Sequence, residues 1–389
     1  MLRMFKKYIH LEGDTRIWAV IFFLVFVSIV VVYSATGGLA YTSYGGNTWY
    51  LFFKHCRFLC IGLIMMYLIH KIPHKYYNRL GQLGFIIAIP ILVYTVVFGT
   101  SLNDANRWIT IGDMPINTFE IGKIAITVFL ARQLVKNQHN LNDFKTIFWR
   151  LFAPLILVCA IIFPANLSTA AMIFIANIML LYLGGVPIKY LSLLIGSIFI
   201  LGVLVIGLSL SVPALQKSFP RSQTWVNRVK NFSQDKSINN DAFYQVAHAK
   251  IAIVNGGIKG RGPGKSTQRN VLPLPNSDYV YAILIEEWGV LGGLSVVFAY
   301  VVLLLRGKRI FNLASDPLAA YLGAGLSISL VLQAFINMAV AVDFFPVTGQ
   351  TLPLISMGGV SVIFTCLSLG IILSASKEIN ISKIKTNVN

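Results

Sequence analysis

Apolar residues are distributed along the chain in runs of about 20, separated by shorter polar stretches. A run of that length, wound as a helix, spans a hydrocarbon core of about 30 Å. The pattern predicts about ten transmembrane helices, at residues 17–39, 51–70, 81–99, 119–135, 147–163, 166–185, 190–212, 278–304, 317–341 and 352–375. We therefore expect an all-α polytopic membrane protein in which residues 1–389 form a single integral membrane domain.

The composition agrees with this pattern. Hydrophobic residues make up 56% of the 389 positions, charged residues only 12%, and the mean hydropathy is +0.72. Soluble domains contain about 25% charged residues, so a soluble enzyme is excluded. The four cysteines all fall inside predicted helices without CxxC spacing, which favours packing over a disulfide or a metal site.

The positions of Lys and Arg predict the orientation of the chain in the membrane. With a cytoplasmic N-terminus, eighteen Lys and Arg residues fall in the inner segments, whereas the short outer loops contain only Arg107. Short cytoplasmic loops are enriched in basic residues, so we expect both termini in the cytoplasm. The same arrangement predicts a multi-pass membrane protein.

One outer connection, residues 214–277, is much longer than the others. It contains ten Lys and Arg residues against two Asp, which indicates an anionic partner or a loose attraction to anionic lipid headgroups. Its stretch NGGIKGRGPGKST, residues 255–267, fails the spacing of a nucleotide-binding P-loop. The glycine amides beside Lys265 can cradle another kind of phosphate, or the stretch is simply a cluster of turns.

Ionisable residues gather near the predicted outer ends of several helices. Arg107 lies in an outer loop, Glu120 and Lys123 lie one turn apart at the start of the fourth span, and Asp278 opens the eighth. Such residues inside a membrane usually face the bundle interior or a wet cavity. They predict a mixed-charge cluster near the outer surface, although Glu120 and Lys123 can equally form a structural ion pair.

The stretch PNSD, residues 275–278, is typical of a helix start, so one of its polar side chains is expected to cap free backbone amides. Glu286 and Glu287 would then lie roughly 12 Å deeper at 1.5 Å per residue. They point to different faces of the helix, and we expect both to bond to neighbouring helices.

The stretch FFPVTGQTLPLISMGGVS, residues 344–361, follows Asn337 and contains two prolines and three glycines. Such residues interrupt a helix repeatedly at its outer end. A broken helix presents free amides that suit an anionic group, whereas ordinary helix packing is the alternative role for the glycines.

Four of these stretches resemble the signatures of one family. NRWITIG…FEIGK, YQVAHAKIAIVNGGIKGRGPGKSTQ, LPLPNSDYVYAILIEEWG and PVTGQTLPLISMGG look like those of the SEDS family, which includes FtsW and RodA. The resemblance spans nearly the whole chain. The wording NVLPLPNSDYVYAI is more similar to FtsW, the division member, than to RodA, the elongation member.

The resemblance implies a peptidoglycan glycosyltransferase. Such an enzyme polymerises lipid II, a disaccharide-pentapeptide on undecaprenyl pyrophosphate, together with a class B penicillin-binding protein and other divisome membrane proteins. The family's catalytic aspartate falls on Asp278, and the reaction needs a base for the attacking hydroxyl and cations for the departing pyrophosphate. The residues that we expect to bind substrate are Arg107, Glu120, Lys123, Arg228, Gln245, Lys265, Asn337, Thr348 and Ser356.

Two stretches depart from the family pattern. PANLSTA, residues 164–170, lacks the usual acidic position, and NTFE, residues 117–120, keeps only Glu120. A lipid II flippase, a RodA-type polymerase and a non-enzymatic scaffold are the alternative functions. We expect no obligatory cofactor and no nucleic-acid partner, although a divalent cation such as Mg²⁺ or Mn²⁺ could bridge an acidic residue to pyrophosphate.

Overall fold

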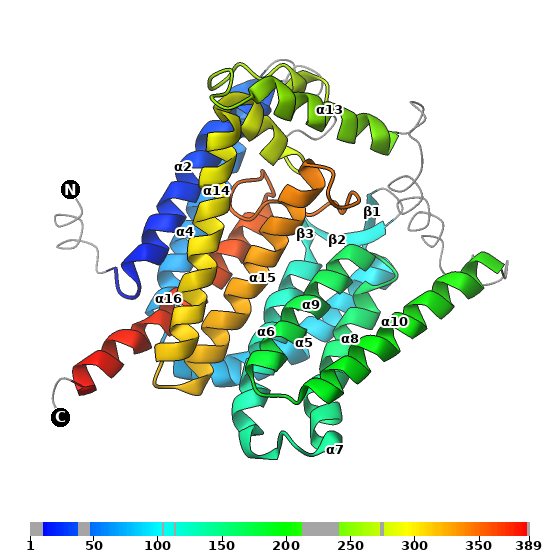
Figure 1. Ribbon diagram of the computed structural model, residues 1–389, viewed down its shortest axis with the longest axis vertical. Helices are drawn as coiled ribbons and strands as arrows, with labels where there is room; N and C mark the ends of the chain where they lie inside the picture. Colours follow the sequence, from blue (N-terminus) through cyan, green and yellow to red (C-terminus); the bar gives the residue numbers. More distant parts are fainter. Residues whose placement is uncertain are drawn as a thin grey trace.

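In a computed structural model of the chain, the structure describes residues 11–37, 47–102, 105–112, 114–211, 241–272 and 276–386. It is a bundle of long helices with a small sheet and a crossing helix, α13, at one end (Figure 1). The N-terminal elements are α2 (Thr15–Ala35), α4 (Thr48–Lys71), η1 (His74–Tyr76), α5 (Tyr77–Phe98), β1 (Thr100–Leu102), β2 (Ala105–Ile111), β3 (Met114–Asn117) and α6 (Thr118–Lys136). The middle elements are η2 (Gln138–Asn140), α7 (Phe144–Ile147), η3 (Phe148–Phe152), α8 (Ala153–Ile162), α9 (Leu167–Leu183) and α10 (Ile188–Ser211). The C-terminal elements are α13 (Asp241–Gly256), η4 (Gln268–Asn270), α14 (Val280–Leu313), α15 (Pro317–Ala341) and α16 (Val360–Thr386).

Helices lie at every position where the apolar pattern predicts a span. Within the described residues, seven helical segments are long and apolar enough to cross a membrane, and two shorter apolar helices are Leu167–Leu183 and Ile188–Leu204. The prediction of an all-α polytopic membrane protein is therefore confirmed. Two helices begin later than predicted, α14 at Val280 and α16 at Val360, because irregular backbone precedes each of them.

The beginning of α2 and the last turns of α16 lie at the same end of the bundle. Lys377 of α16 donates a hydrogen bond to the carboxylate of Glu12, and the backbone N–H of Asp14 donates to Ser376 Oγ at 2.9 Å. The hydrogen bond and the charge of Lys377 lower the pKa of Glu12, although desolvation of this carboxyl acts in the opposite direction. The two ends of the described chain thus share one face of the membrane, as the positions of the basic residues predict.

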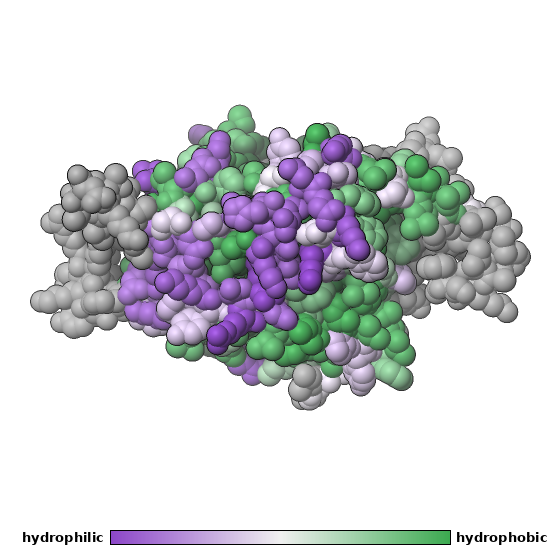
Figure 2. Space-filling model, turned by 90° about the horizontal axis from the view of Figure 1, so that it is seen from below, coloured by the Kyte–Doolittle hydropathy of each residue, from purple (hydrophilic) through white to green (hydrophobic). Residues whose placement is uncertain are grey.

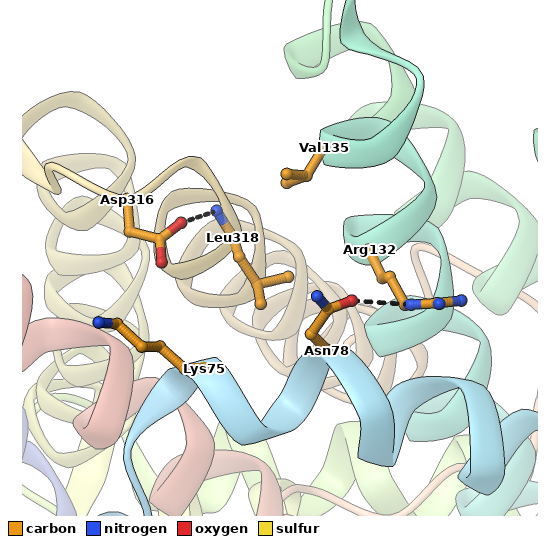
Figure 3. A pocket seen from close by; sticks show the side chains of 6 residues that line it. All are labelled: Lys75, Asn78, Arg132, Val135, Asp316 and Leu318. Atoms are coloured by element: carbon orange, nitrogen blue, oxygen red, sulfur yellow. Dashed lines mark hydrogen bonds between the residues drawn. The ribbon is translucent and has the colours of Figure 1, made fainter.

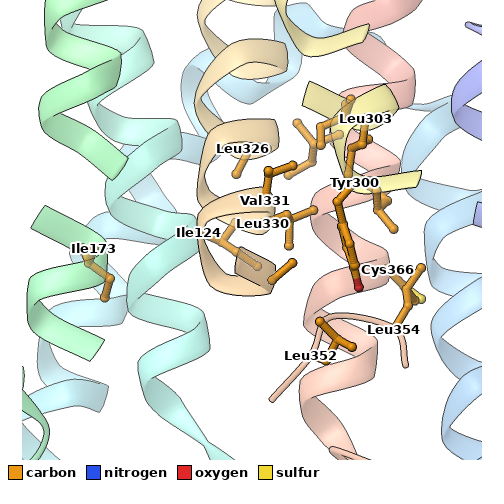
Figure 4. Close-up of a cluster of buried hydrophobic side chains, with 14 of the residues drawn as sticks. Ile124, Ile173, Tyr300, Leu303, Leu326, Leu330, Val331, Leu352, Leu354 and Cys366 are labelled. Carbon is orange, nitrogen blue, oxygen red and sulfur yellow. The ribbon is translucent and has the colours of Figure 1, made fainter. Parts of the chain in front are cut away.

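Helix α15 forms the centre of the bundle and is buried on nearly all sides. Leu326, Leu330 and Val331 of α15 belong to the same buried cluster as Tyr300 of α14 (Figure 4). The Tyr300 hydroxyl donates a hydrogen bond to the carbonyl of Pro353, so α14 also holds the segment before α16. Ser327, Gln333 and Asn337 of α15 are buried, and polar side chains within a membrane span usually face the bundle interior, which accounts for this central position.

The lipid-facing helices, in contrast, expose large apolar side chains. On α10 Phe199 is 71% and Leu201 60% exposed, and α10 lies at the edge of the bundle (Figure 1). Residues of this kind match acyl chains, so this edge of the molecule faces the hydrocarbon core.

A three-stranded antiparallel sheet occupies the outer connection between α5 and α6. Its strand order is β1-β2-β3, with Trp108 opposite Asn117 and Ile109 opposite Ile116. A plain loop is the prediction for this connection, and the sheet is not predicted because its strands are short. The sheet sets the position of Arg107, which lies on β2.

Candidate active site

Asp278 lies in the turn of residues 276–279, immediately before α14, and is half-buried. The Ser277 hydroxyl donates to Asp278 Oδ1 at 3.1 Å. The backbone of the turn is held from two sides, since Asn337 Nδ2 donates to the Asp278 carbonyl at 3.0 Å and Ser356 Oγ donates to the Ser277 carbonyl at 2.7 Å. The carboxylate is thus carried on a turn that the central helix fixes.

The prediction that this turn caps the helix is wrong. The N-cap residue of α14 is Tyr279, and it makes no side-chain capping hydrogen bond. The side chains of the PNSD stretch have other roles, because Asn276 Nδ2 donates to Met357 Sδ at 3.3 Å and the Ser277 hydroxyl bonds Asp278. The Asn276 carbonyl also accepts from the Met357 N–H at 2.9 Å. The turn is therefore a link to the segment before α16.

Residues 342–359, between α15 and α16, form the irregular segment that the prolines and glycines predict. Two amide side chains of α15, four residues apart, hold it: Asn337 Nδ2 donates to the Gln350 carbonyl at 2.6 Å, and Gln333 Nε2 donates to the Thr351 carbonyl at 3.0 Å. Gln350 Nε2 in turn donates to Thr169 Oγ1 at 2.8 Å, at the start of α9. Thr348 is half-buried on the same segment, and Ser356 is 1% exposed.

Asp278 and Arg107 converge at Gly349 in this segment. A Cβ placed on Gly349 would lie 3.8 Å from Asp278 Oδ2 and 3.9 Å from Arg107 Nη1. A carboxylate and a guanidinium, which come from the start of α14 and from β2, therefore face the same point. A side chain at position 349 would therefore touch both groups, and Gly349 is itself exposed.

A buried ion pair lies behind this segment. Lys123 pairs with Glu120, one turn earlier on α6, and Lys123 Nζ donates to Gln333 Oε1 at 2.6 Å. Lys123 is 3% and Glu120 7% exposed. The pair thus belongs to the bundle interior and connects α6 to α15, and through Gln333 to Thr351. Of the two alternatives open in the sequence, the ion pair is formed, and its lysine continues into a polar chain toward the site.

Glu286 and Glu287 hold the glycine-rich stretch against α14. Glu286 is fully buried and accepts hydrogen bonds from Ser266, Thr267 and Gln268. Glu287 accepts from Ser34 Oγ of α2. The expectation of a helix partner is therefore right for Glu287, whereas Glu286 bonds to a loop.

The predicted depth of these two glutamates is wrong because α14 is not one straight helix. It is bent at Gly289, whose φ is 71°, and residues 256–262 pack backbone against backbone there. The Arg261 N–H donates to the Glu286 carbonyl at 3.0 Å, and the Gly262 N–H donates to the Glu287 carbonyl at 2.9 Å. The first leg of α14 therefore lies at the level of the outer loop (Figure 1).

Helix α13 lies over the outer end of the bundle and is tied to it at several points. Lys250 pairs with Asp343, just after α15, and His248 Nδ1 is 2.7 Å from Gln268 Oε1. Gln245 is half-buried on α13, and Lys265 is exposed in the glycine-rich stretch beside Gly262. Arg228 lies outside the described residues.

The two stretches that depart from the family pattern begin helices. The Asn166 side chain accepts from the Thr169 N–H and caps α9, and the Asn117 side chain accepts from the Phe119 N–H and caps α6. Asn and Asp are favoured at such positions because they satisfy free amides. In the described part of the chain, no group of three or more His, Cys, Asp or Glu side chains comes together as a metal site.

Sequence reasoning missed three residues of this arrangement: Gln333, Gln350 and Thr169. Gln333 carries the same signal as Asn337, a polar side chain within an apolar span, and the spacing of four places both on one face. Gln350 and Thr169 carry no such signal, since their pairing depends on how the irregular segment folds back over α9.

The family model for cell cycle proteins of the FtsW/RodA/SpoVE type matches residues 14–381. The chain belongs to this family. Among curated relatives, the probable peptidoglycan glycosyltransferase FtsW of Saccharophagus degradans is 29% identical over 94% of this chain and 93% of its own length. The corresponding protein of Pseudomonas fluorescens is 31% identical over 90% of this chain and 85% of its own.

Solved structures support the same fold. RodA of Thermus thermophilus matches with a TM-score of 0.66 and 19% identity, covering 94% of this chain and 97% of its own. A chain from a structure titled as a peptidoglycan synthase complex matches with a TM-score of 0.69 and 20% identity, covering 92% of this chain and 97% of its own. The family expected from the four motifs is confirmed by the family model, and the curated relatives named FtsW show a likeness to FtsW in particular.

Proposed function

We propose that this FtsW/RodA/SpoVE-family protein is a peptidoglycan glycosyltransferase that polymerises lipid II at the outer face of the bacterial cytoplasmic membrane, for septal wall synthesis. The observation that carries the proposal is the convergence of Asp278 and Arg107 on Gly349 at the outer end of the bundle. The names of the FtsW relatives support the same reaction and the division role. We further propose that residues 1–389 act as one integral membrane domain.

Asp278 is the general base of the proposed reaction. Its carboxylate takes the proton of the sugar 4-hydroxyl as that oxygen bonds to the anomeric carbon of the growing strand. The bond from that carbon to the lipid pyrophosphate breaks in the same step, and the pyrophosphate leaves with the electron pair. An α-linked donor thus gives a β-1,4 product by a single inversion, without a covalent enzyme intermediate.

Arg107 faces the same point as this carboxylate, and in the proposal it stabilises the negative charge that develops on the pyrophosphate. Lys123 is already paired with Glu120 and bonded to Gln333. We assign these three residues to positioning, because they fix Thr351 and with it the segment around Gly349. Lys265 and Gln245 belong to the outer loop region, where they suit the sugar or peptide portion of the substrate.

The site offers a metal ion one carboxylate ligand, that of Asp278. Asp278 could share a divalent cation such as Mg²⁺ with pyrophosphate oxygens, since hard cations prefer such oxygens. When bound, the ion would neutralise pyrophosphate charge. The described residues supply no further carboxylate cluster for it, so the substrate would provide most of its ligands.

The distribution of charge supports a polymerase over a flippase. A path through the membrane needs ionisable groups along its whole length, down to the midplane. Helix α15 contains no charged residue, and α16 contains none before Lys377, so these two helices provide no such path. We also propose a class B penicillin-binding protein as the partner, which the likeness to a chain of a peptidoglycan synthase complex supports.

The test uses the purified full chain with its cognate class B penicillin-binding protein and fluorescent lipid II in vesicles. We expect long glycan strands from the native protein and none from Asp278→Asn, with unchanged thermal unfolding and lipid II binding. Asp143→Asn is the matched control, since Asp143 is an exposed helix cap at the cytoplasmic end. Normal strand synthesis by Asp278→Asn would overturn the assignment of the base.

A further inference from the structure

A polar pocket opens at the cytoplasmic end of the bundle, far along the helices from the candidate active site. It has a volume of about 140 Å³ and lies between η1 and α5, α6, and the first turn of α15 (Figure 3). The residues that line it are Lys75, Asn78, Arg132, Val135, Asp316 and Leu318. Seen from this end, hydrophilic residues gather across the middle of the face, with hydrophobic residues beside them (Figure 2).

The pocket has an excess of positive charge. Both oxygens of Asp316 are engaged, since Oδ1 accepts from the Leu318 N–H at 2.9 Å and Oδ2 is 2.7 Å from His74 Nε2. Arg132 Nε donates to Asn78 Oδ1 at 2.8 Å, which orients the guanidinium. Within the described residues, neither Lys75 nor Arg132 has a carboxylate within 4.0 Å. Among the described residues, both cations can therefore still meet an anion.

A second cavity, of about 270 Å³, follows the same pair of helices into the membrane. Residues of α5 and α6 line it together with residues of α4 and α16, and the lining is almost wholly apolar. The one hydroxyl among them, that of Tyr77, donates to the Ile69 carbonyl at 3.0 Å. Gly84 leaves room on the wall, because a Cβ placed there meets no atom within 4 Å.

The two cavities share one face of α6. Ile121, Ala125 and Val128 line the apolar groove, Arg132 lines the polar pocket, and successive members of this set are three or four residues apart. From Ile121 to Arg132 the helix rises about 16 Å. Half of a hydrocarbon core is about 15 Å, so the groove has the depth of one leaflet.

We propose that this face binds an anionic phospholipid of the inner leaflet, with one acyl chain in the groove and the headgroup phosphate between Lys75 and Arg132. The two cavities match the two parts of a phospholipid. The apolar groove has the length of an acyl chain in one leaflet, and the positive pocket lies where the headgroup phosphate would be. The positive pocket favours a lipid with net negative charge, because a zwitterionic headgroup carries its own ammonium. The site joins α5, α6 and α15, so the bound lipid stabilises the inner end of the bundle.

The proposal is tested on the purified full chain by native mass spectrometry and thermal unfolding, with three probes: dioleoylphosphatidylglycerol, dioleoylphosphatidylcholine and glycerol 3-phosphate. We expect the first to bind and to raise the unfolding temperature, and the other two to do so far less. Equal stabilisation by glycerol 3-phosphate would overturn the lipid site in favour of a soluble phosphate. Equal binding of the two lipids would overturn the role of the charges.

Two variants and one control complete the test. Lys75→Gln/Arg132→Gln should weaken binding of the anionic lipid about 30-fold, since each basic residue near a membrane contributes about fivefold. Gly84→Leu should fill the groove and abolish stabilisation without a clash. Lys308→Gln/Arg309→Gln removes the same charge elsewhere at the cytoplasmic end and should leave binding unchanged. An equal loss in this control, or full binding by Gly84→Leu, would refute the site.

Discussion

The side chain of Asn337 is the joint between the two segments that carry the candidate site. Its Nδ2 donates to the Asp278 carbonyl at 3.0 Å and to the Gln350 carbonyl at 2.6 Å, and the residue is 1% exposed. Asn337→Ala removes both hydrogen bonds at once. We expect it to lower stability and glycan synthesis together, because the acid and the irregular segment lose their shared attachment.

The magnitude follows from the two carbonyls that are left buried. An unsatisfied buried acceptor costs about 1–3 kcal/mol, so two of them cost about 2–6 kcal/mol. Asn177 is the matched control, because it is also 1% exposed and its Nδ2 donates only to the Ile173 carbonyl of its own helix, at 2.8 Å. Asn177→Ala should cost about 1 kcal/mol, since the helix still satisfies that carbonyl.

Both variants are assayed for thermal unfolding and for the rate of lipid II polymerisation with the cognate transpeptidase. We expect Asn337→Ala to reduce kcat at least tenfold while KM changes little, since the Asp278 carboxylate remains but its position is no longer fixed. Asn337→Asp should behave alike, because it keeps the shape and loses the donor. If Asn337→Ala matches Asn177→Ala in both unfolding temperature and kcat, the two segments do not depend on this amide.

Three further outcomes follow from the backbone and the ion pairs. Gly289→Ala should cost about 3 kcal/mol or more in thermal unfolding, because its Cβ would meet a backbone oxygen at 2.1 Å, whereas Gly257→Ala, also at positive φ but in open space, should cost about 1 kcal/mol. Gly349→Ala should unfold like Gly257→Ala yet lose polymerisation at least tenfold, since its methyl group fills the point between the candidate carboxylate and guanidinium; retained activity would contradict the site. The pKa of Glu12 is lowered in the folded state, so its contact with Lys377 stabilises the protein above pH 4.5, and this stabilisation is lost as the pH falls below that value. The native protein should therefore unfold at a higher temperature than Glu12→Gln at neutral pH, and the difference between the two should shrink in acid. A difference that grows in acid would contradict this contact.

The helices were predictable because a run of about 20 apolar residues is enough to identify a membrane span. The bend at Gly289 was not, since EEWGVLGG continues an apolar run and only the approach of residues 256–262 requires a positive φ there. The same approach gives Glu286 its partners, so both errors have one cause. The sheet beside Arg107 and helix α13 were hidden for a related reason: their segments lie outside the membrane, where burial no longer marks them.

The position of Asp278 could be predicted in sequence but not in space. The motif that contains it indicates an acid at the outer end, whereas its meeting with Arg107 at Gly349 depends on the fold of three separate segments. Asn337 and Gln333 link two of these segments, the turn and the irregular segment, to α15 by hydrogen bonds to backbone carbonyls. Such bonds are read from a structure and not from residue type, which is why the network around the acid stayed unseen.

The turn with Asp278 and the irregular segment are both attached to α15, the most buried helix, and this affects how the site responds to changes in the membrane. Bilayers that thin or thicken act first on helices at the lipid boundary, such as α10, by altering their tilt. Helix α15 is shielded from that force by its neighbours, and its Asn337 bonds both the turn and the irregular segment. The geometry of the candidate site should therefore depend little on lipid composition. The protein should then be equally active in flat membrane and in the curved membrane of a constriction.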